Sequence, residues 1–108
     1  MQSMSLNTIK NALLGVSDAV YHFSAPPNTP PPYIEWAEDG ENVFMAGNRH
    51  AETAVSGTID LYTKDDSDPL RAAIPEALNN TECAWYKNST QYEEDTGLIH
   101  DEWVFEVL

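Results

Sequence analysis

The sequence has few basic residues, and this shortage argues against one class of partner. Five Lys and Arg stand against eighteen Asp and Glu in 108 residues, which gives a formal net charge of −13. Binding to a phosphate backbone depends on cationic side chains that displace counterions, so this charge opposes it. We expect no sequence-specific recognition of nucleic acid. The charge is compatible with solubility, with docking to a basic protein, and with a surface that DNA passes without adhering.

Cysteine and long apolar runs are also scarce. The single Cys83 cannot form an internal disulfide, and beside Ala84 and Trp85 we expect a packed, reduced thiol in a reducing compartment. No apolar run reaches the roughly 18 residues of a membrane span, and residues 1–5 lack the basic and apolar regions of a signal peptide. These features predict a soluble protein made in the cytoplasm, with no membrane partner.

Sequence motifs of catalysis and cofactor binding are missing. There is no G-x-S-x-G elbow, no G-x-x-x-x-G-K-[ST] phosphate loop and no G-x-G-x-x-G fingerprint. His22, His50 and His100 lie far apart, without the spacing that places two metal ligands on one helical face, and we expect them to be exposed. The sequence therefore predicts no enzyme activity, no cofactor and no metal site.

Two acidic clusters have structural interpretations. Residues 65–68 lack the Gly and Glu of a calcium loop, so we interpret them as a turn that ends in a helix cap. The carboxylates of residues 93–95, Asp101 and Glu102 surround one predicted hairpin. We interpret them as outward-facing charges that protect an edge from stray strand pairing, rather than as the acid pair of a glycosidase.

Apolar spacing predicts two helices. The first covers residues 6–15, between Ser5 as N-cap and Gly15 as stop. The second follows Asp68, which can act as N-cap before a proline at the first helical position. Pro75 lies inside the apolar pattern of this second helix. Because proline lacks the N–H that a helix needs, we expect a kink or two short helices there.

Five strands are expected, at residues 19–23, 33–37, 51–64, 83–92 and 98–107. Gly57 is expected to mark a bulge or a bend, and residues 95–97 a turn. One face of the last strand should carry Ile99, Asp101, Trp103, Phe105 and Val107. The strand aromatics are expected to pack in the core rather than form a stacking platform: Tyr33, Trp36, Trp85, Trp103 and Phe105. The order α-β-β-β-α-β-β predicts one α+β domain over 1–108, with a mostly antiparallel sheet and two helices packed on it.

An apolar cluster is the main candidate for a functional surface. After a turn signal at Asp39-Gly40, Val43-Phe44-Met45 falls in a predicted loop rich in Gly and Asn, which gives these residues no local reason to be apolar. Two interpretations stay open: an interface with a subunit or partner, and folding back over the core. Residues 26–32 contain five prolines and predict an extended crossing segment or contact arm. The residues expected at an interface are Val43, Phe44, Met45, Arg49, Pro30 and Pro31.

Three segments, 32–40, 57–69 and 91–107, resemble the tail-completion proteins of long-tailed bacteriophages and prophages, also called tail terminators, head-tail joining proteins or minor capsid proteins. The resemblance also rests on the element order, from the first helix to Val107. It implies an α+β subunit that forms a ring, commonly a hexamer, on the head-proximal end of the tail tube. The implied partners are further copies of the chain, the tail tube protein and the head-tail connector. The implied location is the virion, after assembly in the bacterial host cytoplasm, and no activity or cofactor is implied.

A second function class stays open. A small acidic protein can mimic DNA and occupy the basic site of a nucleic-acid-binding enzyme. Such an inhibitor needs carboxylates at phosphate-like spacing on one face, whereas here they cluster at turns and alternate with aromatic residues. An enzyme with a diffuse site is a third interpretation, disfavoured by the missing motifs.

Overall fold

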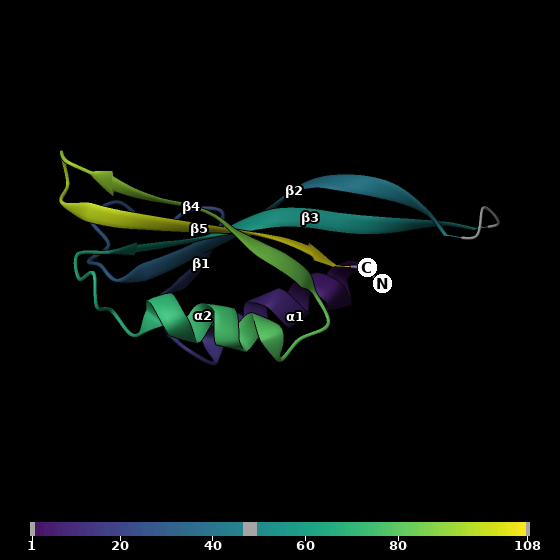
Figure 1. Cartoon of the computed structure of the whole chain (residues 1–108), viewed down its shortest axis with the longest axis horizontal. Coiled ribbons are helices and arrows are strands. Elements are labelled where there is room, and N and C mark those ends of the chain that lie inside the picture. The colour runs from purple at the N-terminus through teal and green to yellow at the C-terminus, as the bar shows by residue number, and fades with distance from the viewer. Residues whose placement is uncertain (1, 47–49, 108) are drawn as a thin grey trace.

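The computed structural model describes residues 2–46 and 50–107, and the side chains of residues 6–40 and 54–107. It is an α+β fold in which a five-stranded sheet carries both helices on one face (Figure 1). The element order is the predicted one. The helices are α1 (Gln2–Leu14) and α2 (Leu70–Asn79), and the strands are β1 (Val20–His22), β2 (Tyr33–Ala46), β3 (His50–Thr63), β4 (Ala84–Glu93) and β5 (Leu98–Val107).

The strands lie in the order β1-β2-β3-β5-β4. Three of the four strand pairs are antiparallel, and β1 and β2 run parallel. The prediction of a mostly antiparallel sheet is therefore confirmed. Because β5 lies between β3 and β4, it is an inner strand, and the edge beyond the final hairpin belongs to β4.

Gly57 lies where the sheet has no room for a side chain. A Cβ atom at this position would be 2.1 Å from the carbonyl oxygen of Ala37 and 2.6 Å from the ring of Phe105. The register shifts between Glu38 and Gly40 in β2, directly opposite Gly57. The bulge predicted at Gly57 is thus present in the sheet, but it falls on the partner strand.

The first helix begins earlier than the sequence predicts. It starts at Gln2, so Ser5 lies inside the helix and its assignment as N-cap is wrong. The end of the helix is as predicted: α1 stops at Leu14, and the N–H of Gly15 donates a hydrogen bond to the Asn11 carbonyl at 3.1 Å. Ser5 does not set the start of the helix, because N-capping contributes less to helix stability than the packing of the apolar face does.

The second helix is one unit. Pro69 already has helical dihedral angles, and Asp68 Oδ1 accepts a hydrogen bond from the N–H of Leu70 at 2.9 Å, as expected of a capping carboxylate. Pro75 does not divide the helix, so of the two expected outcomes, a kink or two short helices, the second is wrong. Fully buried side chains hold α2 to the sheet on both sides of this proline, and they are Ile74 and Leu78.

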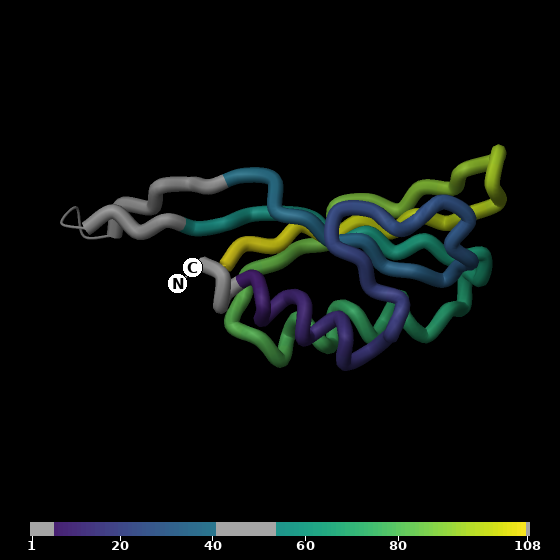
Figure 2. The backbone as a smooth tube through the Cα atoms, turned by 180° about the vertical axis from the view of Figure 1, so that it is seen from behind, coloured from purple at the N-terminus to yellow at the C-terminus, as the bar shows by residue number. Residues whose placement is uncertain are grey.

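The core lies between the helices and one face of the sheet. Figure 2, a view from behind, shows α1 and α2 side by side along this face. The predicted inward face of β5 is confirmed, since alternate residues from Asp101 to Val107 are buried. The buried core consists of Ile9, Leu13, Ile34, Trp36, Val55, Ile59, Leu61, Ile74, Leu78, Trp103, Phe105 and Val107.

The strands β2 and β3 extend beyond the rest of the sheet. The pairing of β3 with β5 stops at Val55, and β1 pairs with β2 at residues 34–36. Among the described residues, 40–46 therefore pair only with β3 and 50–54 only with β2, and we call these two stretches the β2–β3 ribbon. A strand of 14 residues spans about 46 Å. This length accounts for the longest dimension of the molecule, 50 Å, against 25 and 24 Å for the others.

The ribbon corrects one prediction. Asp39-Gly40 is not a turn, and Val43-Phe44-Met45 is not in a loop, because β2 continues to Ala46. The bulge accommodates Asp39 without ending the ladder, and pairing resumes between Gly40 and Ser56. The long-range pairing with β3 thus prevails over the local turn signal.

Candidate assembly surfaces

The predicted interface residues fall into two separate groups. The first comprises Val43, Phe44 and Met45, whose backbone belongs to the β2–β3 ribbon and whose side chains lie outside the described residues. Arg49 also lies outside the described residues. Pro30 is exposed and Pro31 is half-buried, and both precede β2. Because the two groups flank opposite ends of β2, the structure does not bring them onto one surface.

The proline-rich segment is tied to the sheet. It connects the parallel strands β1 and β2. The N–H of Ala25 donates a hydrogen bond to Glu35 Oε2 at 2.8 Å, and Thr29 Oγ1 donates to the Pro26 carbonyl at 2.6 Å. The segment is therefore a crossing connection with its own anchors, which agrees with the first of its two predicted interpretations.

The sheet face opposite the helices, which we call the open face, carries a row of stacked rings. The ring centroids of Tyr33 and Tyr62 are 5.0 Å apart, and those of Tyr62 and His100 are 4.3 Å apart. This row crosses β2, β3 and β5. The placement of Tyr33 in the core is thus wrong, because alternation along β2 directs Ile34 to the helices and Tyr33 to the open face.

His100 is paired rather than exposed. Its Nε2 lies 2.6 Å from Asp60 Oδ1 and its Nδ1 lies 3.8 Å from Glu93 Oε2. The side chain of His100 is 18% exposed, which contradicts the expectation of an exposed histidine. The hydrogen bond to Asp60 raises the pKa of the imidazole above its ordinary value. Burial, assisted by Asp60, also raises the pKa of the Tyr62 hydroxyl, so this tyrosine stays protonated at neutral pH.

Replacing His100 by glutamine is expected to remove a pH-dependent contribution to stability. Since its pKa is raised in the folded state, the folded protein holds this proton more tightly than the unfolded chain. That contribution is complete below the unfolded pKa and is lost as the pH rises through the folded pKa. The urea midpoint of the wild type, measured relative to His100→Gln, should therefore fall as the pH rises above about 6.5.

The matched variant is Asp60→Asn, which removes the charge of the partner and should reduce the same pH-dependent difference. Parallel midpoints of the wild type and His100→Gln over this pH range would show that the pair does not couple to folding.

A buried carboxylate was not predicted. Asp101 is fully buried on the helix face, which corrects its assignment as an outward-facing charge on an edge. Its Oδ2 accepts from Arg71 Nε at 2.7 Å, and its Oδ1 accepts from Thr90 Oγ1 at 2.6 Å and lies 3.1 Å from Lys87 Nζ. Arg71 Nη2 completes a two-point contact at 3.2 Å. Three elements, α2, β4 and β5, thus meet at one carboxylate.

The partners of Asp101 decide its charge state. Burial acts to raise the pKa of the carboxyl, but the hydrogen bonds from Arg71, Thr90 and Lys87 hold it below its ordinary value. The Asp101 contacts also raise the pKa of Arg71. Both oxygens of the carboxylate are thus engaged inside the fold, in an ion-pair cluster that ties α2 and β4 to β5.

In residues 6–40 and 54–107, no group of three or more His, Cys, Asp or Glu side chains is placed to hold a metal ion. Neither described helix has the length and apolar content needed to span a bilayer. The ribbon, the open face and the sheet edges are the candidate surfaces that the structure describes.

Comparison with known proteins gives a likeness of fold. No protein-family model matches the sequence, and no curated protein matches it. A chain in a solved structure of the virion of a native gene transfer agent particle is similar in structure, with a TM-score of 0.56 and 14% sequence identity. The match covers 91% of this chain and 88% of the other. At this identity the likeness concerns the fold, and it extends over nearly the whole of both chains.

Proposed function

We propose that this protein is a structural component of a phage-like virion. The observation that carries the proposal is the likeness of fold to a chain of a gene transfer agent virion, over 91% of this chain. The sequence resemblance to tail-completion proteins favours one position for it. In that position a homo-oligomeric ring, with six subunits as the expected number, caps the tail tube and joins the tail to the head through the connector. The proposal assigns no catalytic activity and no cofactor.

The β2–β3 ribbon supports an assembly role. An isolated two-stranded hairpin is at best marginally stable in water, and residues 40–46 and 50–54 have no other strand beside them within the described part of the chain. Contact with a neighbouring subunit would stabilise the ribbon. Because a ring needs two different complementary surfaces on each subunit, a ribbon at one end of an elongated molecule is a suitable component.

The acidic composition supports the same position. With a net charge of −13, a ring of this protein presents carboxylates around its opening, and DNA that passes through is repelled rather than held. Assembly takes place in the bacterial host cytoplasm and the mature location is the virion.

Substitution in the ribbon tests the proposal. Replacing Phe44 and Met45 together by serine should leave the fold intact, because the core cluster of the described residues is built from the helices and from the part of the sheet outside the ribbon. Particle assembly should fail, so that electron micrographs of a producing strain show filled heads and separate tails. Circular dichroism and a thermal melt of the purified double variant check the fold.

Tyr92→Ser is the matched control, since it removes a 65% exposed aromatic ring near the β4–β5 turn. Heads and tails should join normally in this control. If the double variant unfolds, Val43-Phe44-Met45 belongs to the core. If it joins heads to tails normally, the ribbon is not the interface, and the proline-rich residues 25–32 become the better candidate.

The DNA-mimic alternative has one observation in its favour. Glu35, Asp60 and Glu102 occupy consecutive cross-strand positions on the open face and form a row of carboxylates. Each of them, however, has an internal partner: the Ala25 N–H, His100 and Asn88, respectively. Carboxylates engaged within the fold are poorly available to a basic site of another protein. The open face is therefore weaker support for a DNA mimic than the ribbon is for an assembly role.

A further inference from the structure

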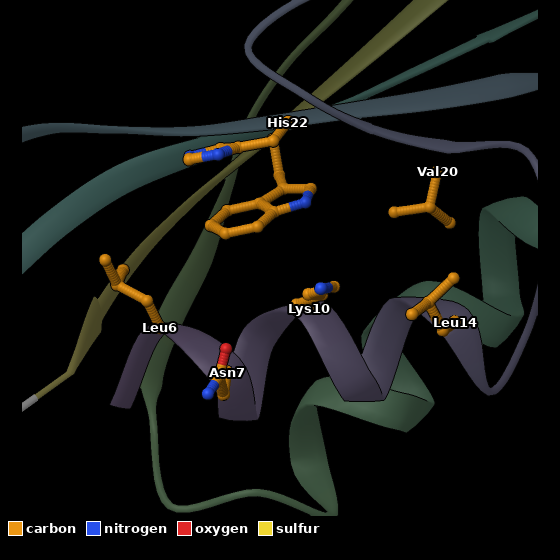
Figure 3. A pocket seen from close by; sticks show the side chains of 7 residues that line it. Leu6, Asn7, Lys10, Leu14, Val20 and His22 are labelled. Carbon is orange, nitrogen blue, oxygen red and sulfur yellow. The ribbon is translucent and has the colours of Figure 1, made fainter. Parts of the chain in front are cut away.

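A pocket lies between α1 and the first two strands. Its volume is about 300 Å³. Figure 3 shows Leu6, Lys10 and Leu14 on the helix facing Val20 and His22 across the opening. Trp36 and Asn7 complete the lining. The walls are mostly apolar, as in sites that bind an apolar side chain, and a small number of polar groups line the rest.

The surface beside the pocket is unusually apolar for an exposed edge. Leu14 is 42% exposed and Phe23 is 60% exposed. Phe23 has a φ of 75°, a backbone conformation that residues other than glycine rarely adopt. Its N–H donates a hydrogen bond to the Trp36 carbonyl at 2.8 Å. Its ring stacks on that of His22 at 4.0 Å, and His22 stacks on Trp36 at 4.1 Å. An aromatic ring is thus exposed next to the pocket, on a backbone conformation that is unfavourable for phenylalanine, and exposed apolar groups of this kind mark contact surfaces.

Lys10 gives the pocket a charge preference. Arg71 and Lys87 are engaged by Asp101, whereas Lys10 has no ion-pair partner among the described residues. In a chain with few cations, an unpaired lysine at the mouth of an apolar pocket favours an occupant with apolar side chains next to a carboxylate.

The β2–β3 ribbon has that composition. It carries Val43, Phe44 and Met45, with Glu41 on the same strand and Glu52 paired with Phe44 on the other. A chain cannot insert its own ribbon into its own pocket. Trp36 lines the pocket, and β2 places Val43 and Met45 about 23 to 30 Å farther along the same extended strand.

We propose that the pocket between α1 and β1–β2 receives the apolar part of the β2–β3 ribbon from a second copy of this chain. The inference rests on the proposed ring and names the two surfaces that form it. Ribbon and pocket are different parts of the subunit, so the contact is head-to-tail, and it can repeat from copy to copy until a ring closes.

Crosslinking tests this contact. In a Cys83→Ser background, a chain with both Leu14→Cys and Met45→Cys is treated with a flexible bis-maleimide, which tolerates sulfur positions that a disulfide does not. The reaction is carried out on the purified protein at high concentration and on purified particles that contain it. The expected result is a ladder of covalent oligomers. Chains with one of the two cysteines should give at most a dimer, and a mixture of the two single-cysteine chains should give a dimer that joins Leu14→Cys to Met45→Cys.

A second variant guards against a chance crosslink. Leu14→Asp places a carboxylate at the pocket of the cysteine-free protein and should abolish oligomers in light scattering and native mass spectrometry, whereas Tyr92→Asp should not. Oligomers that form without the ladder would overturn the ribbon-and-pocket contact and leave the proposed function standing. A chain that is absent from the particles would refute the proposed function, and this contact with it.

Discussion

Replacing Asp101 by alanine is expected to lower the free energy of unfolding by about 3 to 5 kcal/mol. The variant removes a fully buried carboxylate and leaves Arg71 and Lys87 without their acceptor, with side chains that are 27% and 40% exposed. Thr90 also loses the acceptor of its 2.6 Å hydrogen bond. The loss is large because two cations then share a partly buried site without its buried anion. Urea unfolding at neutral pH measures it.

The pH dependence provides the control. Because the pKa of Asp101 is lowered in the folded state, its stabilising contribution is present above the unfolded pKa and is lost as the pH falls through the folded pKa. The difference between the wild type and Asp101→Ala should therefore shrink in acid. Asp101→Asn keeps the shape and one acceptor, and should cost less than alanine. A loss below about 1 kcal/mol at neutral pH would show that the ion pairs only offset their own desolvation.

Replacing Trp103 by alanine is expected to cost about 3 to 5 kcal/mol. The side chain is 1% exposed and is the largest of the fully buried side chains. Its removal leaves a cavity between β5 and the helices, and the strands on both sides of β5 limit how far the site can collapse. The variant also removes the ring over which Lys87 Nζ lies at 4.9 Å from the centroid. The urea midpoint and the thermal melt both report this loss.

Tyr86→Ala is the matched control for Trp103→Ala. It deletes an aromatic ring from the neighbouring strand at a position that is 57% exposed, so the change in stability should be within about 0.5 kcal/mol. If Trp103→Ala also costs less than about 1 kcal/mol, the ring is not part of the core and the facing of β5 is reversed. Because Lys87 contacts both Trp103 and Asp101, the stability losses of Trp103→Ala and Asp101→Ala should not be additive.

The sequence predicts those parts of the fold that depend on local periodicity. Alternation along residues 98–107 placed Trp103 and Phe105 on the buried face, and the apolar spacing in α1 placed Ile9 and Leu13 there, as the structure has them. These patterns are strong because each covers most of an element. The predicted order of elements and the α+β class follow from the same signals.

Features set by long-range pairing could not be predicted in the same way. The signal at Asp39-Gly40 is local, whereas the ladder that carries β2 through it depends on β3, whose register is fixed by the whole sheet. Asp101 is a similar case. Alternation pointed it inward, but its partner Arg71 is 30 residues away in a helix, and no spacing rule links them. The charge alone therefore favoured a surface position.

The candidate surfaces were predicted in part. The sequence singled out Val43-Phe44-Met45 for composition, and the structure places that backbone on the β2–β3 ribbon. The pocket beside α1 had no sequence signal, because Leu6, Leu14, Val20 and Trp36 are indistinguishable from core residues until the helix is seen to leave a gap. The strained Phe23 was equally hidden, since nothing about a phenylalanine after a strand predicts a positive φ.

The unpaired margins of the β2–β3 ribbon have a consequence for the free subunit. Within the described residues, both long sides of the ribbon present peptide groups with no neighbouring strand, and such margins recruit further strands into fibrous aggregates. Glu41 and Glu52 occupy this part of the sequence, and the whole chain repels its copies through a net charge of −13. In the proposed virion role, solubility before assembly and adhesion during assembly would both involve this short segment, and acidic conditions that neutralise its carboxylates would favour fibres over closed particles.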